Sequence, residues 1–283
     1  MYRPLLCAFV SAVAVAPASA QLTGTLTNGN ATFTQTSTPT SIGSTQMRAS
    51  FRPEGGTTTN SLYDQWMFYR VTGDTRERPF GNYSSGGITT ALTGNFAGST
   101  ATYNLTDSNA LGTRFTAAWV INLVDSAAPN TATLNHAVTI NNPGLTPLTI
   151  SLFQYVDIDL ADTAGGQSAS GGINGMTSTN GTLNGTLTPI TPATNFQASA
   201  FSALRTSLTD NSITNLSNSG LPFSPGDVTF AYQWDVTIPA GGSTVISSQM
   251  GVSPVPEPGL IIACCLGLAG LGRVYAKRRK VVA

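Results

Sequence analysis

The chain has 283 residues, enough for one large domain with a core that folds unaided. Charged residues make up only 9% of it, against about 25% in an ordinary soluble protein, and Thr, Ser, Asn and Gly take their place. Outside the two termini the basic residues are a few arginines outnumbered by acidic ones, which excludes the basic field that a nucleic-acid-binding surface needs, so nucleic acid is not expected as a partner.

The N-terminus has the three parts of a signal peptide. Arg3 gives a positive start, the residues from Leu5 to Ala16 form an apolar run, and an Ala-x-Ala site ends at Ala20. The apolar run is too short to cross a bilayer, which needs about 20 residues. We therefore expect residues 1–20 to be removed, with Gln21 as the new N-terminus.

Between residues 21 and 252 the chain is predicted to be all-β. Residues 62–69 are dense in aromatic residues and are expected to form a strand. Apolar residues then alternate with polar ones over 115–123, 134–140 and 228–236, which is the period of a half-buried strand. The turn residues 141–144 predict a hairpin between 134–140 and the strand 148–160. Residues 164–184, rich in Gly, Ser, Thr and Asn, are expected to form a long loop or an irregular hairpin. The fold expected is a large antiparallel β-sandwich.

The three cysteines do not contribute to this domain. Cys7 lies in the leader, and Cys264 and Cys265 lie in a C-terminal apolar run. No disulfide framework and no cysteine-based metal site is therefore expected in the domain.

Asp157, Asp159 and Asp162 form the best candidate site. Residues two apart on a strand point to the same side, so Asp157 and Asp159 are expected about 6–7 Å apart. Three interpretations stay open: a solvated strand end capped by Asp, a Ca²⁺ site that uses carboxylate and carbonyl oxygens, and an acid/base pair for glycoside hydrolysis. Two carboxylates on one strand do not easily flank a sugar bond. No catalytic residue is assigned, and Ca²⁺ is the one cofactor considered.

Two further features have a structural and a functional interpretation. His136 shares the parity of apolar neighbours, which favours a core residue, although a Ser-His-Asp triad would have to use it. Trp66, Tyr69 and Arg70, with charged residues after them, favour core aromatics flanked by ion pairs, with an aromatic platform for sugar rings as the alternative.

The C-terminus, residues 253–283, combines three parts in order. Pro256, Glu257 and Pro258 precede an apolar run from Leu260 to Gly272. A basic cluster follows, made of Arg273, Lys277, Arg278, Arg279 and Lys280. An apolar run followed by a basic cluster is typical of a single transmembrane helix with its basic end in the cytoplasm.

These three parts, paired with a signal peptide, resemble the PEP-CTERM sorting signal of Gram-negative bacteria. The resemblance implies an exosortase-type processing enzyme as a partner, transient anchoring in the inner membrane, and delivery to the cell surface or the medium. Many proteins with such a signal are associated with exopolysaccharide and biofilm matrix, so polysaccharide is a further partner considered.

The sequence therefore leads to three segments: a signal peptide (1–20), an exported β-sandwich domain (21–252) and a sorting segment (253–283). We expect the domain to be a non-enzymatic surface or matrix protein. The alternative is a secreted carbohydrate-active enzyme or a module that binds Ca²⁺ or sugar.

Overall fold

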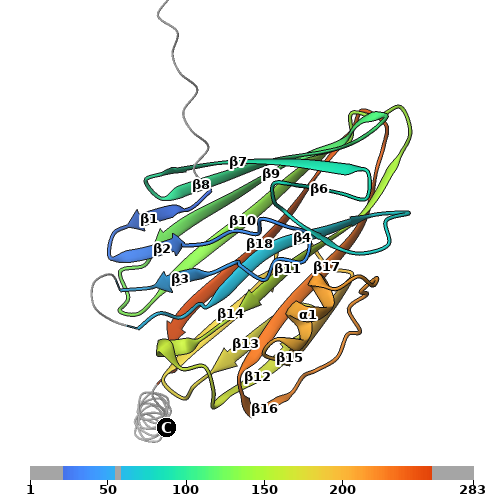
Figure 1. The fold of residues 1–283 in the computed structure, drawn as a ribbon. Helices are drawn as coiled ribbons and strands as arrows, with labels where there is room; N and C mark the ends of the chain where they lie inside the picture. Colours follow the sequence, from blue (N-terminus) through green and yellow to red (C-terminus); the bar gives the residue numbers. More distant parts are fainter. Residues whose placement is uncertain (1–21, 55–58, 257–283) are drawn as a thin grey trace, which may run out of the picture.

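The computed structural model describes residues 22–54 and 59–256, which form three antiparallel sheets (Figure 1). The largest sheet has ten strands in the order β16-β12-β13-β14-β18-β10-β9-β8-β7-β6. A five-stranded sheet has the order β15-β17-β11-β4-β5, and a three-stranded sheet has the order β1-β2-β3.

The bounds of the elements follow the chain. The first half contains β1 (Gly24–Asn28), β2 (Ala31–Gln35), β3 (Ala49–Arg52), β4 (Asp64–Val71), β5 (Arg78–Pro79), β6 (Tyr83–Ser85), β7 (Ile88–Ala97), β8 (Thr100–Asn109), β9 (Gly112–Asp125) and β10 (Ala132–Asn141). The second half contains β11 (Leu148–Asp157), the short 3-10 helix η1 (Leu160–Asp162), β12 (Gln167–Gly172), β13 (Gly175–Thr179), β14 (Leu183–Pro189), β15 (Asn195–Ala200), α1 (Ala203–Thr209), β16 (Phe223–Gly226), β17 (Val228–Ile238) and β18 (Ser243–Pro254).

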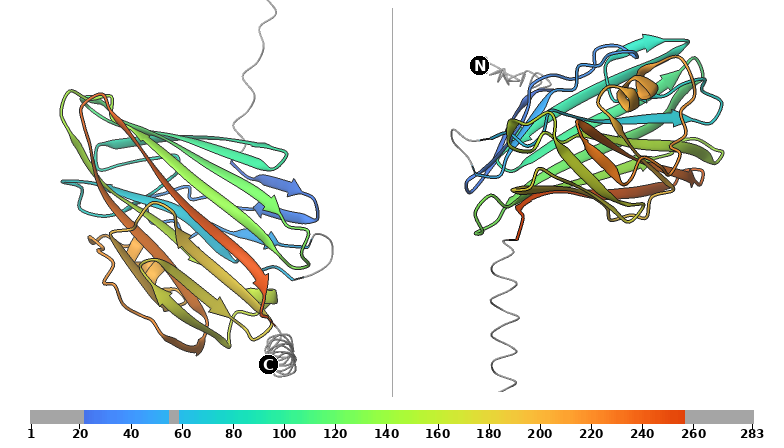
Figure 2. Two further views of the ribbon diagram at one scale, coloured as in Figure 1. Left: turned by 180° about the vertical axis from the view of Figure 1, so that it is seen from behind. Right: turned by 90° about the horizontal axis from the view of Figure 1, so that it is seen from below.

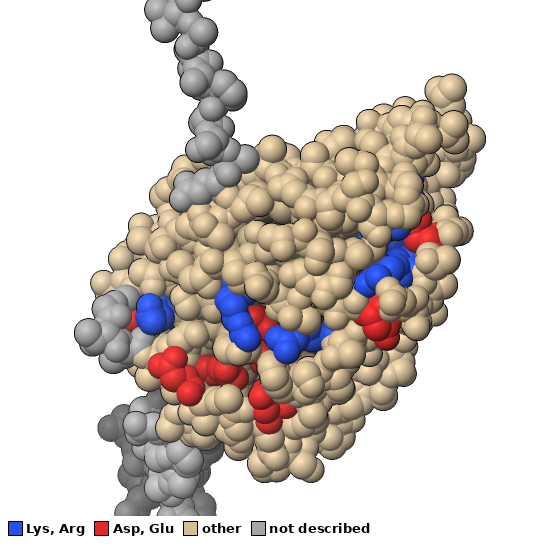
Figure 3. Space-filling view, viewed as in Figure 1, with Lys and Arg blue, Asp and Glu red and all other residues tan. Residues whose placement is uncertain are grey.

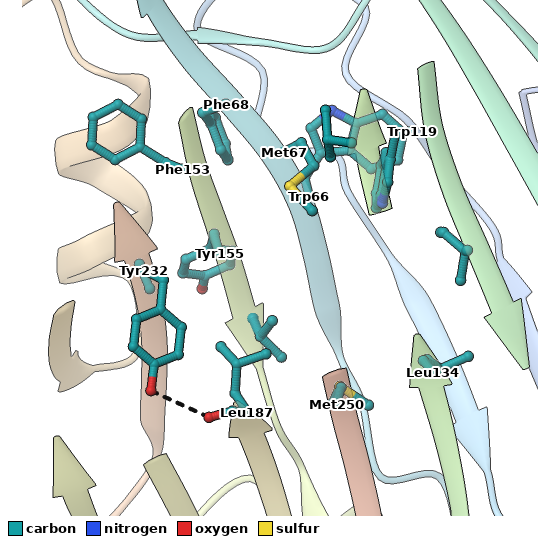
Figure 4. Close-up of a cluster of buried hydrophobic side chains, with 14 of the residues drawn as sticks. Trp66, Met67, Phe68, Trp119, Leu134, Phe153, Tyr155, Leu187, Tyr232 and Met250 are labelled. Carbon is teal, nitrogen blue, oxygen red and sulfur yellow. Dashed lines mark hydrogen bonds between the residues drawn. The ribbon is translucent and has the colours of Figure 1, made fainter. Parts of the chain in front are cut away.

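The sheets stack in two layers around one core. The ten-stranded sheet is the back layer in Figure 1, and the two smaller sheets lie in front of it. Trp66 of β4 meets Trp119 of β9 edge to face, with ring centroids 5.2 Å apart (Figure 4). Between β17 and β14, the Tyr232 hydroxyl donates a hydrogen bond to the Leu187 carbonyl. Large aromatic side chains in such contacts each bury a large apolar area.

β11 is covered on both faces. Every residue from Ile150 to Asp157 is buried. One side of this five-stranded sheet faces the ten-stranded sheet, and α1 packs on the other side against β15, β17 and β5 (Figure 1). Arg70 on β4 fixes that segment by donating a hydrogen bond of 2.7 Å to the Thr214 carbonyl.

The prediction of a mostly β fold with large antiparallel sheets is confirmed. The predicted hairpin between 134–140 and 148–160 is wrong. β10 pairs with β9 and β18, whereas β11 pairs with β4 and β17 in the other layer. The turn at 141–144 therefore carries the chain from one sheet to the other. Periodicity shows that a strand has a buried face, but it does not show which strand pairs with it.

Of the two alternatives expected for 164–184, the structure has the hairpin and not the long loop, because β12 pairs with β13 and the start of β14 follows. Their inward residues include Gln167, Ala169 and Ser178, which are small or polar although buried. These residues give no apolar stripe that would reveal a strand.

Several predictions concern residues outside the described ranges. These are the cleavage site at Ala20 and Gln21, the apolar run, Glu257 and Pro258, and the basic cluster. Among the residues that the structure does describe, no helix is long and apolar enough to cross a membrane.

Candidate functional site

Four aspartates meet where one end of the five-stranded sheet opens into turns. Asp157 is the last residue of β11, and Asp64, opposite it, is the first residue of β4. Asp159 lies just before η1, and Asp227 lies between β16 and β17. On the face seen in Figure 3, acidic and basic side chains gather in a belt across the molecule.

Asp64 is the paired member of the group. It is fully buried, and Arg205 of α1 donates a hydrogen bond of 2.7 Å to one of its oxygens. Arg48 lies 3.4 Å from the other oxygen. Burial raises the pKa of Asp64, and the two arginines oppose that shift.

Asp157, Asp159 and Asp227 have no such partners. Each offers one carboxylate oxygen to a group whose atoms all lie within 4.8 Å of one another. Asp157 is only 1% exposed, yet neither of its oxygens has a hydrogen-bond partner. Asp159 and Asp227 each have one buried oxygen without a partner. A buried carboxylate without a donor is costly, so this group lacks a positive partner among the described side chains.

The electrostatics of the group follow from burial and like charge. Desolvation, followed by repulsion from Asp159, Asp227 and Asp64, raises the pKa of Asp157 to about 9. Desolvation and then repulsion from Asp227 and Asp64 raise the pKa of Asp159 to about 6. The pKa of Asp227 is raised as well, mainly by desolvation. Three acids that repel one another in a low-dielectric site ionise together more readily when a cation joins them.

A buried hydroxyl without a partner and a turn with left-handed backbone lie beside the group. The Tyr155 hydroxyl, on the same parity of β11 as Asp157, is buried and has no hydrogen-bond partner. Ala161 and Asp162, which follow Asp159 and Leu160, both have left-handed backbone, with φ of 59° and 57°. Residues other than glycine seldom adopt this conformation, and it costs about 1–3 kcal/mol where it occurs.

The structure brings two of the three sequence-predicted aspartates together. Asp157 and Asp159 share the group, but Asp162 faces Asn60 instead. Its carboxylate accepts a hydrogen bond of 3.1 Å from the Asn60 N–H, and its own N–H donates to the Asn60 carbonyl at 2.7 Å. Asp162 thereby joins the turn after β11 to the segment before β4.

The other sequence candidates have structural surroundings. Trp66 and Tyr69 are fully buried, so they offer no platform for a sugar ring. Arg70 forms an ion pair with Glu77. His136 is 2% exposed, and its Nδ1 accepts a hydrogen bond of 3.3 Å from the Trp119 indole.

Sequence reasoning missed Asp227 and Asp64. Asp227 follows Gly226 and precedes the apolar stripe of β17, so it occupies the start of a strand, as Asp64 does in β4. A carboxylate at a strand start is a usable signal. Finding its neighbours, however, requires the strand order, which here places β4 and β17 on either side of β11.

No family model matches the chain, and no curated protein matches it. Similar solved structures include a bacterial glucoamylase complexed with acarbose, with a TM-score of 0.49 and 13% identity over 89% of this chain and 35% of that one. They also include a "putative aldose 1-epimerase" from Escherichia coli K12 (TM-score 0.46, 10% identity, 82% of this chain and 99% of that one). A third is a "putative kojibiose phosphorylase" from the human microbiome (TM-score 0.39, 12% identity, 89% and 29%).

This chain thus spans about a third of the glucoamylase. The expectation of a non-enzymatic domain is contradicted by these neighbours, which are named as sugar-processing enzymes. At such identities and TM-scores the likeness assigns no role to any residue of this chain.

Proposed function

We propose that the exported domain is a carbohydrate-active protein whose acidic group, Asp157, Asp159 and Asp227, binds a divalent cation of the Ca²⁺ type. One observation carries the cation: Asp157 is buried, and both of its oxygens lack a donor beside two further carboxylates. Ca²⁺ takes six to eight oxygen ligands at about 2.3–2.6 Å, and three carboxylates with backbone carbonyls and water are a donor set that suits it.

The charge balance supports the same conclusion. Arg205 and Arg48 both lie against Asp64 and act on the other three carboxylates only from a distance, so four ionised carboxylates would exceed the two arginines by two negative charges. A dication would offset that charge and would return the raised pKa values of Asp157 and Asp159 toward the ionised range.

A second candidate is glycoside hydrolysis by a carboxylate pair. The objection that both acids lie on one strand does not apply to Asp227, which comes from the segment before β17. The oxygens of the group lie within 4.8 Å, close to the separation of about 5 Å in retaining glycoside hydrolases. In that function Asp227 and Asp159 would serve as the pair.

Export and sorting belong to the same proposal. The signal peptide with its site at Ala20 and Gln21 would take the domain across the inner membrane. The motif Pro256–Glu257–Pro258 and the basic cluster would hold it there for an exosortase-type enzyme, before delivery to the surface or the medium. The resemblance to the PEP-CTERM signal supports this part, and so does the paired signal peptide.

Thermal unfolding with added CaCl₂ tests the cation. A ligand at 100 times its Kd adds about 2.7 kcal/mol to the free energy of unfolding, which for a domain of this size raises Tm by roughly 5–10 °C. We expect that rise in the wild type and its loss in Asp227→Asn. Asp162→Asn is the matched control, because it removes the same charge from the turn after Asp159 but outside the group, and it should keep the rise.

The outcomes separate the candidates. Loss of the calcium shift in Asp162→Asn, with the shift retained in Asp227→Asn, would replace our trio by the sequence-predicted one. No shift in any form, together with hydrolysis of an oligosaccharide in EDTA that Asp159→Asn abolishes, would favour the carboxylate pair over the cation.

A further inference from the structure

The outward face of the ten-stranded sheet contains no charged side chain. Strand pairing places one set of alternate residues on this face across β7, β8, β9, β10, β18, β14 and β13. In these strands, from Thr116 onward in β9, every outward residue is Thr, Ser, Asn, Gln, Ala, Val or Gly. Arg114 precedes that part of β9 and turns at a bulge to pair with Asp107.

The charges of the described chain lie elsewhere. They fill the acidic site, the ion pairs around β4 and β5, and the belt in Figure 3. That belt is on the side of the smaller sheets, whereas the left view of Figure 2 shows the ten-stranded sheet from behind as an outer layer. Charged residues make up about 25% of an ordinary protein, whereas the few charges of the described residues are absent from this face.

The face carries donors and acceptors in rows. Strand register aligns Thr100, Asn122, Asn135 and Gln249 across four neighbouring strands. Neighbouring strands lie about 4.8 Å apart, so this row extends about 14 Å. The Gln249 amide donates a hydrogen bond of 2.7 Å to Asn135 within it. Asn104 and Asn122 are exposed, and no described side chain holds their amides.

This chemistry argues against two classes of partner. Protein interfaces depend on buried Trp, Tyr and Arg anchors, and the outward residues include none of these types. The largest apolar side chains are valines, such as Val124 and Val245, which are 41% and 53% exposed. Acidic polymers and anionic membranes require Lys or Arg, which are likewise missing from this set.

We propose that this face binds a neutral polysaccharide. Such a polymer is uncharged and presents repeating hydroxyl groups that both donate and accept, which matches uncharged hydroxyl and amide groups spread over a broad sheet. Each contact is weak, but a polymer that meets several rows at once gains avidity from the repeats. This site is separate from the acidic group and needs no cation.

Sedimentation of the full-length protein with insoluble polysaccharides tests the proposal. Microcrystalline cellulose, curdlan and starch granules serve as neutral probes, and carboxymethyl-cellulose serves as the charged counterpart of cellulose. All incubations contain EDTA, so failure of the cation proposal does not affect the result. We expect at least one neutral glucan to deplete the protein from solution, and carboxymethyl-cellulose to deplete it at least fivefold less.

Two double variants locate the surface. Asn104→Asp with Asn122→Asp adds two charges to the face at constant side-chain shape, and we expect it to lower the bound fraction at least fivefold. Asn174→Asp with Asn211→Asp adds the same charge at exposed positions off the face and should bind like the wild type. Equal Tm values would show that both variants fold.

The proposal is overturned if no neutral glucan retains the wild type, or if the face variant binds equally well. A face variant that dissociates a dimer without any glucan binding also overturns it, because a second copy would then be the occupant.

Discussion

His136, the one histidine of the chain, lies in a place where a positive charge cannot be solvated. It is 2% exposed, its Nε2 has no partner, and burial lowers its pKa to about 3. In the unfolded chain its pKa would be about 6.5. Below that value the unfolded state binds a proton that the folded state does not, so this residue makes stability fall as pH decreases from about 6.5 toward 3.

The variant His136→Gln isolates this contribution. Glutamine keeps an acceptor for the Trp119 indole but does not titrate. We expect the difference in free energy of unfolding between wild type and variant to change by up to about 1.4 kcal/mol per pH unit below pH 6, at the expense of the wild type. Urea unfolding at pH 7, 6, 5 and 4 measures it. Parallel curves would mean that His136 is protonated in the folded state.

Strand β14 packs against the turn that carries two carboxylates of the acidic site. Gly185 on this strand lies under Ile158, and a Cβ added there would approach Ile158 Cγ2 to 2.7 Å and Leu160 Cδ2 to 3.1 Å. Ile158 lies between Asp157 and Asp159, so the close approach of the strand to this turn helps to set where the two carboxylates lie.

Gly185→Ala is expected to destabilise the domain by about 1–3 kcal/mol, because Ile158 and Leu160 are buried and have little room to move. It should also weaken the calcium-induced rise in Tm. Gly175→Ala on the neighbouring strand β13 is the control. Its new methyl group would find only the Thr188 hydroxyl, at 3.8 Å, so stability and the calcium shift should hardly change. Equal effects of the two substitutions would contradict the role given to Gly185.

The same elements explain how far sequence reasoning reaches. The strands β9, β10 and β17 have large apolar side chains at alternate positions, so their existence follows from the sequence alone. β11 is buried on both faces, and β12 and β13 bury Gln167, Ala169 and Ser178 beside a single large apolar residue, Met176, so neither alternation nor hydrophobicity reveals their partners. Asp157 and Asp159 are neighbours in the chain and were predicted together, whereas Asp227 joins them only through the pairing of β17 with β11.

The whole molecule places two different surfaces on opposite layers. Charge and the acidic group belong to the side of the smaller sheets, and the uncharged face belongs to the ten-stranded sheet (Figures 2 and 3). In the two proposals, the domain holds a polymer on one side and keeps the acidic group free on the other. The two proposals can fail independently, since Asp227→Asn and the Asn104/Asn122 double variant affect different surfaces.

Hydrogen bonds define where the domain ends and the C-terminal segment that we propose as the sorting signal begins. β18 ends at Pro254, paired with Leu183 of β14, and the Val255 N–H donates a bond of 2.8 Å to the Thr182 carbonyl. Deleting Pro256 to Ala283 therefore removes no contact seen in the described domain. We expect the shortened protein to appear in the periplasm or the medium with an unchanged Tm. Deleting from Ser253 onward is the control, because it also removes the last pairs of β18 with β14 and should lower Tm.

Replacing Pro256, Glu257 and Pro258 by alanine would retain the apolar run and the basic cluster, so that protein should stay in the membrane fraction. Fractionation and thermal unfolding of the three forms decide the boundary. An insoluble product from the first deletion would mean that the domain extends past Val255 and that the terminal segment contributes to its core.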